Sequence, residues 1–166
     1  MGMWFTQSDK QLGSQFNFSR FIIDIRKYNR LFNQLVIAAR LKYGFVSGNA
    51  PFYEKFYLGG PNSIRGYPDR SLSPVGGGDR QVLAGLELRI PVSKKRYPDH
   101  FLTGVIFLDT GTNIRESEKL TTDQFKSSYG FGLRFRLPFI GLFRMDFAYP
   151  FENDQKRIHF SLGHTF

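Results

Sequence analysis

The chain contains no cysteine and no long apolar run, and each absence excludes a group of proteins. Without cysteine there can be no disulfide framework, no thiolate nucleophile and no cysteine-based zinc site. The longest uninterrupted apolar stretch is LPFIGLF, residues 137–143, whereas a membrane-spanning helix needs about 18 apolar residues. A helical membrane protein is therefore excluded.

Histidine is scarce, and the three that occur, His100, His159 and His164, show no metal-ligand spacing. His159 and His164 fall on opposite faces of a strand because their spacing is odd, so they cannot bind one ion together. No metal site is expected. Residues 1–10 lack a basic region followed by a long apolar core, so no signal peptide is expected in them.

Motifs of catalysis and cofactor binding are also missing. The glycine run PVGGGD, residues 74–79, lacks the lysine and the Ser or Thr of a phosphate-binding loop. The sequence G-x-S-x-G does not occur, and Ser63 has no evident partner base. We therefore expect no catalytic residues, no cofactor and no enzymatic activity.

Positive charge and aromatic residues are both abundant. The 166 residues carry a formal net charge of +9 and include 19 Phe and 8 Tyr. This length allows a single domain, residues 1–166. The charge suits nucleic acid, anionic lipid or an acidic partner and by itself selects none of them.

Apolar and polar residues alternate through most of the chain, which is typical of β-strands with two different faces. Residues 129–137 place aromatic side chains and leucine on one face and Arg134 and Arg136 on the other. Residues 143–149 set Arg144 and Asp146 opposite a similar aromatic face. About eight strands are predicted, at residues 2–8, 15–28, 34–45, 80–91, 101–109, 129–137, 143–149 and 157–166.

The chemistry of the two faces is the reverse of that in a soluble protein. A soluble core would have to bury Arg134, Arg136, Arg144 and Asp146, and buried charges are costly unless paired. In a transmembrane barrel the aromatic residues face lipid and the charges face the lumen. The sequence therefore predicts an all-β, antiparallel transmembrane β-barrel. A soluble β-domain with amphipathic strands is the alternative.

Short and long connections alternate along the predicted strands. Residues 27–31, 93–100 and 138–141 are short, whereas 47–78 and 111–126 are long. Long loops of outer-membrane barrels lie outside the cell and short turns lie in the periplasm. We therefore expect both termini on the periplasmic side.

Residues 56–67, FYLGGPNSIRGY, resemble the loop signature of the BamA-like outer-membrane assembly and two-partner-secretion transporter superfamily. We call them the signature loop. GLELRIP and FLDTGTNI resemble strands that follow this loop, and GLFRMDFAYPF with IHFSLGHTF resembles the closing strand pair. The signature residues are Gly59, Gly60, Ile64, Arg65, Gly66 and Tyr67, and the C-terminal strand signal is Phe160, Leu162 and Phe166.

The resemblance implies that the signature loop folds into the barrel and that Arg65 pairs with acidic side chains on the inner wall. Alternation selects the candidates. Glu87 lies between Leu86 and Leu88, which take the lipid side, and Asp109 follows the same pattern. A guanidinium held there should bind one or both carboxylates bidentately. The lumen charges on the last strands are expected to pair with loop residues.

The resemblance further implies membrane-protein insertion or polypeptide translocation in a bacterial-type outer membrane. The barrel would act by disturbing the bilayer and by offering a strand edge to an incoming hairpin. Implied partners are outer-membrane lipid or lipopolysaccharide and unfolded outer-membrane proteins, without nucleic acid. The alternatives are a structural or pore-forming barrel without insertase activity, a lipid-acting barrel enzyme and a nucleic-acid-binding β-domain.

Family members usually have about twice as many strands, preceded by periplasmic repeats that this chain lacks. A closed barrel of eight strands is filled by its own side chains, which leaves no room for residues 47–78. An open sheet in lipid would leave backbone groups unpaired. We therefore expect a homodimer that pairs first and last strands into a two-chain barrel. The alternatives are a closed monomer with the loop displaced and a fragment that needs a different partner chain.

Overall fold

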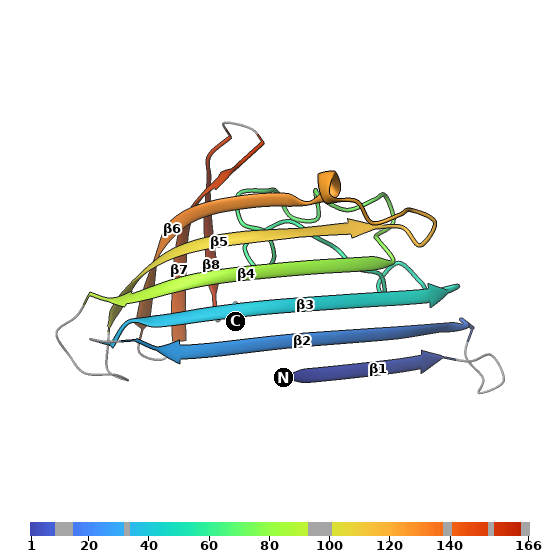
Figure 1. Ribbon diagram of the computed structural model, residues 1–166, viewed down its shortest axis with the longest axis horizontal. Coiled ribbons are helices and arrows are strands. Elements are labelled where there is room, and N and C mark those ends of the chain that lie inside the picture. Colours follow the sequence, from blue (N-terminus) through green and yellow to red (C-terminus); the bar gives the residue numbers. More distant parts are fainter. Residues whose placement is uncertain (9–14, 32–33, 93–100, 138–140, 153–154, 164–166) are drawn as a thin grey trace.

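The computed structural model describes residues 1–8, 15–31, 34–92, 101–137, 141–152 and 155–163. Its eight strands form one antiparallel sheet in which each strand pairs with its neighbours in the sequence (Figure 1). No helix within these residues is long and apolar enough to cross a membrane. The strands are β1 (Gly2–Ser8), β2 (Phe18–Arg30), β3 (Val36–Gly48), β4 (Arg80–Pro91), β5 (Leu102–Ile114), β6 (Lys126–Leu137), β7 (Gly141–Pro150) and β8 (Arg157–Leu162).

The predicted all-β, antiparallel class is confirmed, and several strand boundaries differ from the prediction, among them the ends of β2, β3 and β5 and the start of β6. β2 continues to Arg30, through residues 27–31 that were expected to form a tight turn. β5 continues to Ile114, five residues beyond Asp109. Both extensions are paired in register, Arg30 with Val36 and Ile114 with Arg80. In these extensions, backbone N–H and C=O groups are satisfied by pairing with the neighbouring strand, although the local sequence is polar and does not predict a strand.

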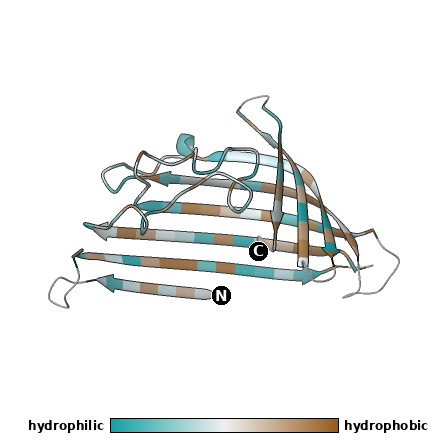
Figure 2. Ribbon diagram, turned by 180° about the vertical axis from the view of Figure 1, so that it is seen from behind, coloured by the Kyte–Doolittle hydropathy of each residue, from teal (hydrophilic) through white to brown (hydrophobic). Residues whose placement is uncertain are grey.

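The sheet is strongly curved. In Figure 1, β1 to β4 run along the long axis, whereas β7 and β8 stand at a steep angle to them. The connection between β3 and β4, residues 49–79, lies on the concave side, as the view from behind in Figure 2 also shows. Within the described residues, β1 and β8 are the two ends of the sheet.

The two faces of the sheet have the reversed chemistry that the alternation predicts, and the strands in Figure 2 are banded accordingly. The convex face exposes large apolar side chains: Leu41, Tyr43, Leu86, Ile106, Leu108, Tyr129, Phe131, Ile158, Phe160 and Leu162. The concave face buries polar and charged side chains: Asp24, Gln81, Glu87, Asp109, Asn113, Ser128, Arg134, Arg144 and Asp146. These polar side chains are therefore buried, while the large apolar side chains of the opposite face are exposed.

Aromatic ladders cross the convex face between the last three strands. Tyr129 stacks on Tyr149 with ring centroids 5.6 Å apart, and Phe131 stacks on Phe147 at 5.0 Å. Cross-strand aromatic pairs of this kind each stabilise a sheet by about 0.2–1 kcal/mol. They hold β6 and β7 together on the exposed convex face.

The antiparallel order places the connections at two ends of the sheet. The long connections, residues 49–79 and 115–125, share one end, and the β2–β3, β4–β5 and β6–β7 connections share the other. β8 ends near this second end, whereas β1 starts partway along β2, with Gly2 opposite Asp24. The longest connection, residues 49–79, lies at the first end, whereas residues 93–100 and 138–140 at the second end lie outside the described residues.

Candidate functional site

Apolar side chains fix the β3–β4 connection to the concave face. Phe56 is 2% exposed and packs with Phe18, Ile22 and Val46 of β2 and β3. Each such aromatic or aliphatic side chain stabilises the packed state by about 1.5–3 kcal/mol when fully buried. A second cluster lies further along the signature loop and consists of Leu58, Ile64, Tyr67 and Leu83.

Polar side chains of β4 and β5 bind the backbone of the same connection. Asn113 Nδ2 donates to the carbonyl oxygen of Phe56 at 2.7 Å, and Gln81 Nε2 donates to that of Tyr57 at 2.9 Å. A buried irregular segment needs such partners because its carbonyls have no neighbouring strand. The loop is therefore held in one position by both its side chains and its backbone.

Arg65 is fully buried against the two carboxylates that strand alternation selects. Its Nε and Nη2 donate to Asp109 Oδ2 and Oδ1 at 2.7 and 2.8 Å, and its Nη1 donates to Glu87 Oε1 at 2.7 Å. The bidentate pair with Asp109 has the fork geometry of strong guanidinium–carboxylate binding. Burial by itself would lower the pKa of Arg65, but the negative charge of Asp109, followed by that of Glu87, raises it above its ordinary value.

The Arg65 guanidinium packs against the face of an aromatic ring. Phe107 of β5 lies 3.5 Å from the guanidinium carbon, measured to the ring centroid, which is a close cation–π contact. The ring projects toward Gly130 of β6, where an added Cβ would lie 2.6 Å from Phe107 Cζ. Gly130 therefore leaves the space that the ring occupies.

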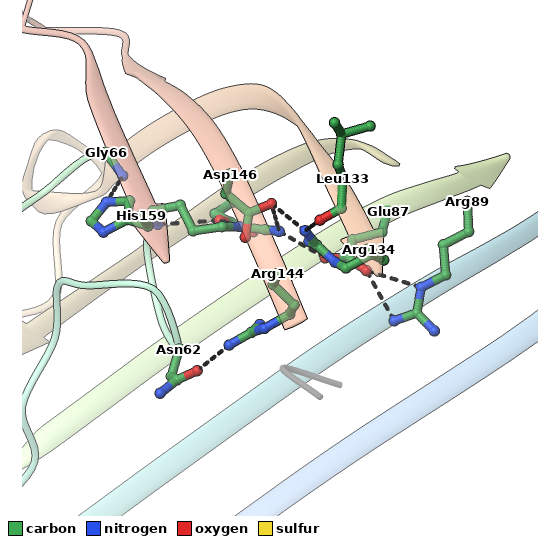
Figure 3. A network of polar contacts seen from close by, with 11 residues as sticks. Asn62, Gly66, Glu87, Arg89, Leu133, Arg134, Arg144, Asp146 and His159 are labelled. Atoms are coloured by element: carbon green, nitrogen blue, oxygen red, sulfur yellow. Dashed lines mark hydrogen bonds and ion pairs between the residues drawn. The ribbon is translucent and has the colours of Figure 1, made fainter. Parts of the chain in front are cut away.

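Charges on β6 and β7 extend this cluster, which Figure 3 shows from close by. Arg134 Nη1 donates to Asp146 Oδ1 at 2.6 Å, and Arg134 Nη2 lies 3.5 Å from Glu87 Oε1. Arg89 binds the second oxygen of Glu87 at 2.9 Å. The same Asp146 oxygen is 3.7 Å from Arg65 Nη1. The charges thus form one connected network around the signature loop.

The other two predicted lumen charges behave differently from each other. Arg144 of β7 is 1% exposed and donates from Nη2 to Asn62 Oδ1 of the signature loop at 2.6 Å, the expected pairing with a loop residue. Arg136 lies on the same face as Arg134 but near the end of β6, where it is exposed. The assignment of Arg136 to the lumen-facing charges therefore stays a prediction.

Glycine is required at the tip of the signature loop. Gly66 has a φ of +91°, and an added Cβ would lie 3.1 Å from Pro150 Cδ of β7. Gly59 and Gly60 also have positive φ values, +109° and +96°, where the chain turns into the loop. Beyond the tip, the Tyr67 hydroxyl donates to the carbonyl oxygen of Ser127 at 3.2 Å.

Three contacts of the site were not predicted from the sequence. Phe107 could have been noticed in the sequence, because it is an aromatic residue on the strand face that otherwise holds charged residues and glycine. Asn62 belongs to the signature loop, but a sequence does not show which strand it meets. His159 was considered only as a metal ligand, whereas its Nε2 accepts a hydrogen bond from the Gly66 N–H at 2.9 Å.

The C-terminal strand signal is described only in part. Phe160 and Leu162 are 61% and 63% exposed on the convex face of β8. Phe166 lies outside the described residues, as do His100 and His164. No group of side chains within the described residues could hold a metal ion.

The model of one protein family, the Omp85 superfamily domain, matches residues 3–166. The chain belongs to the Omp85 superfamily. It is 33% identical over 93% of its length to the outer membrane protein assembly factor BamA of Nitratidesulfovibrio vulgaris, covering 21% of that protein. It is 31% identical over 87% of its length to the chloroplastic outer envelope protein 39 of Arabidopsis thaliana, covering 39% of that protein.

A solved structure shows the same fold. This Omp85 chain matches the crystal structure of BamA from Haemophilus ducreyi lacking POTRA domains 1–3, with a TM-score of 0.73 and 23% identity. The match covers 89% of this chain and 35% of that one. The chain therefore spans well under half the length of these Omp85 relatives.

Proposed function

We propose that this chain forms part of an outer-membrane β-barrel that inserts membrane proteins or translocates polypeptides. The observation that carries the proposal is the signature loop, which is fixed to the concave wall by the ion pairs of Arg65 with Glu87 and Asp109. Membership of the Omp85 superfamily and the 33% identity to an outer membrane protein assembly factor support it.

The proposed mechanism requires no covalent chemistry. β1 and β8 each have one strand neighbour in the described sheet, so each can offer backbone N–H and C=O groups to an incoming strand. Substrate would be an unfolded outer-membrane protein that adds to this edge. Met3 and Phe5 of β1 are 61% and 66% exposed, an apolar edge suited to a lipid boundary.

The proposed location follows from the faces and ends of the sheet. The exposed apolar convex face would contact outer-membrane lipid or lipopolysaccharide, with the charged concave face toward the lumen. The end with residues 49–79 and 115–125 would face outside, and both chain termini would face the periplasm.

Reconstitution tests the proposal. The full chain in lipid vesicles is mixed with a urea-unfolded small β-barrel protein, and substrate folding is followed by the heat-dependent shift of its gel mobility. We expect the wild type to accelerate folding over empty vesicles and Arg65→Ala to lose most of that acceleration. Arg115→Ala, which removes an exposed loop arginine, is the matched control and should keep it. Wild-type vesicles no faster than empty ones would instead favour the structural or pore-forming barrel.

We also propose a homodimer in which β1 of one copy pairs with β8 of the other, twice, to form a two-chain barrel. The support is the pair of sheet ends, because unpaired backbone groups cost several kcal/mol each in lipid. The strands of a longer chain are the other source of partners. Cysteines introduced separately at Phe5 and Phe160, which both lie on the convex face, in a chain without any other cysteine, should form a disulfide between copies when the two variants are mixed. Monomer alone in native mass spectrometry, with no such disulfide, would refute the dimer.

A further inference from the structure

The signature loop is hydrogen-bonded to the end strand of the sheet, β8, through a single histidine, and we call this hydrogen bond the tie. Most of its polar contacts go to β4, β5, β6 and β7, as described above. To β8, the part of the chain that the structure describes has one hydrogen bond, from the Gly66 N–H to His159 Nε2 at 2.9 Å (Figure 3). β8 ends the sheet, so this bond joins the buried charge cluster to an edge strand.

The direction of the bond fixes the protonation state of the imidazole. A backbone N–H can only donate, so His159 Nε2 must carry a lone pair and its proton must be on Nδ1. A protonated imidazolium has N–H groups at both nitrogens and cannot accept. Gly66 is buried, and a buried N–H without an acceptor is unfavourable. Protonation of His159 would therefore remove the bond and leave Gly66 unsatisfied.

Charges of both signs surround His159. Asp146 lies directly across from it on β7, in register and on the same face, and Arg157 shares its strand. The charges of Asp69 and Arg65, both in the β3–β4 connection, also act on the imidazole. Asp146 keeps one buried oxygen, Oδ2, without a hydrogen-bond partner. Asp146 therefore places a carboxylate opposite the imidazole on the neighbouring strand.

We propose that His159 is a positioning residue that ties the tip of the signature loop to β8, and that protonation of its imidazole releases the tip. The tie itself is independent of the proposed function. Its consequence rests on that function: if β8 is the edge that receives a substrate strand, the released and tied states differ in how freely β8 moves against the loop.

Hydrogen–deuterium exchange on the full chain in lipid nanodiscs tests the tie. Exchange of the peptide containing Gly66 is compared at pH 7.5 and pH 5 after correction for the intrinsic pH dependence of exchange. For the wild type we expect protection at pH 7.5 and a loss of about tenfold or more at pH 5. His159→Gln supplies an amide oxygen that accepts but does not titrate, and it should stay protected at both values. His159→Ala should be unprotected at both.

A double variant, His100→Gln with His164→Gln, is the matched control for the two other histidines and should keep the wild-type response. Equal protection of the wild type at both pH values would overturn the proposal. So would the wild-type pH response in His159→Gln, since another group would then titrate. If His159→Ala does not fold, the comparison of wild type with His159→Gln decides alone.

Insertion assays on the same variants separate this proposal from the proposed function. A wild type that inserts substrate faster than empty vesicles, with a rate that changes between pH 7.5 and pH 5 while that of His159→Gln does not, supports both. A confirmed tie with unchanged insertion overturns the consequence for β8 only. A confirmed tie in a chain without insertion activity overturns the proposed function and leaves the tie standing.

Discussion

Arg65→Ala should destabilise the fold mainly through one carboxylate. Glu87 keeps Arg89 at 2.9 Å and Arg134 at 3.5 Å when Arg65 is removed. Asp109 is different, because every polar contact of its carboxylate within the described residues is with Arg65. Asp109 is 2% exposed, so bulk water does not contact its carboxylate in the wild type. The backbone N–H of residue 65, at 3.2 Å, is all that remains beside it.

The expected loss is about 3 kcal/mol of unfolding free energy, the lower end of what breaking a buried pair costs. This is roughly a hundredfold in the folding equilibrium constant. The lost contact with Phe107 adds about 0.5–2 kcal/mol, and the new alanine leaves a space beside the ring. Arg65→Lys keeps the charge but loses the fork to Asp109, so it should recover only part of the loss.

Urea unfolding in lipid vesicles, followed by circular dichroism, measures the effect as a shift in midpoint at constant slope. Arg115→Ala is the control for removing an exposed arginine. Arg65→Ala combined with Asp109→Asn removes the isolated charge and should be more stable than Arg65→Ala alone. The reasoning fails if the unfolding free energy of Arg65→Ala is within about 0.5 kcal/mol of the wild-type value, which is the size of effect that an ordinary surface substitution has. It also fails if the double variant is no better than the single one.

Three further predictions address the loop tip, the orientation and the convex face. Gly66→Ala should cost roughly 1–3 kcal/mol in the same unfolding assay, whereas Gly76→Ala, with a similar φ but open space around it, should cost less. In intact cells, a membrane-impermeant maleimide should label Lys119→Cys in the long connection and spare Asn29→Cys at the other end; the reverse pattern would invert the topology. Phe131→Lys on the convex face should cost about 2–4 kcal/mol in bilayers, and a stability loss near zero there would argue against lipid contact.

Strand alternation and the family resemblance together identified the partners of Arg65. Because side chains alternate faces along a strand, the apolar neighbours of Glu87 and Asp109 already assign both carboxylates to the charged face. The family resemblance supplied the loop that meets them. The same alternation assigned Arg134, Arg144 and Asp146 to that face, and each is buried there.

The alternation of side chains did not predict which residues of the charged face are buried or where each strand ends. Arg136 has the same alternation as Arg134, yet Arg134 is buried and Arg136, near the end of β6, is exposed. Strand ends also shifted, since cross-strand pairing extended β2 and β5 beyond the alternating stretches. Neither result is a property of the segment alone.

The sequence by itself determined the fold class, the number of strands and the two chemically distinct faces, because these follow from a two-residue period within single segments. Tertiary structure decided which residues meet across the concave face: Arg65 over Phe107, Asn62 with Arg144 and Gly66 with His159. These contacts join residues far apart in the chain, and the curvature of the sheet and the path of the loop set the distances between them. The link from the signature loop to β8 is therefore visible only in the folded molecule.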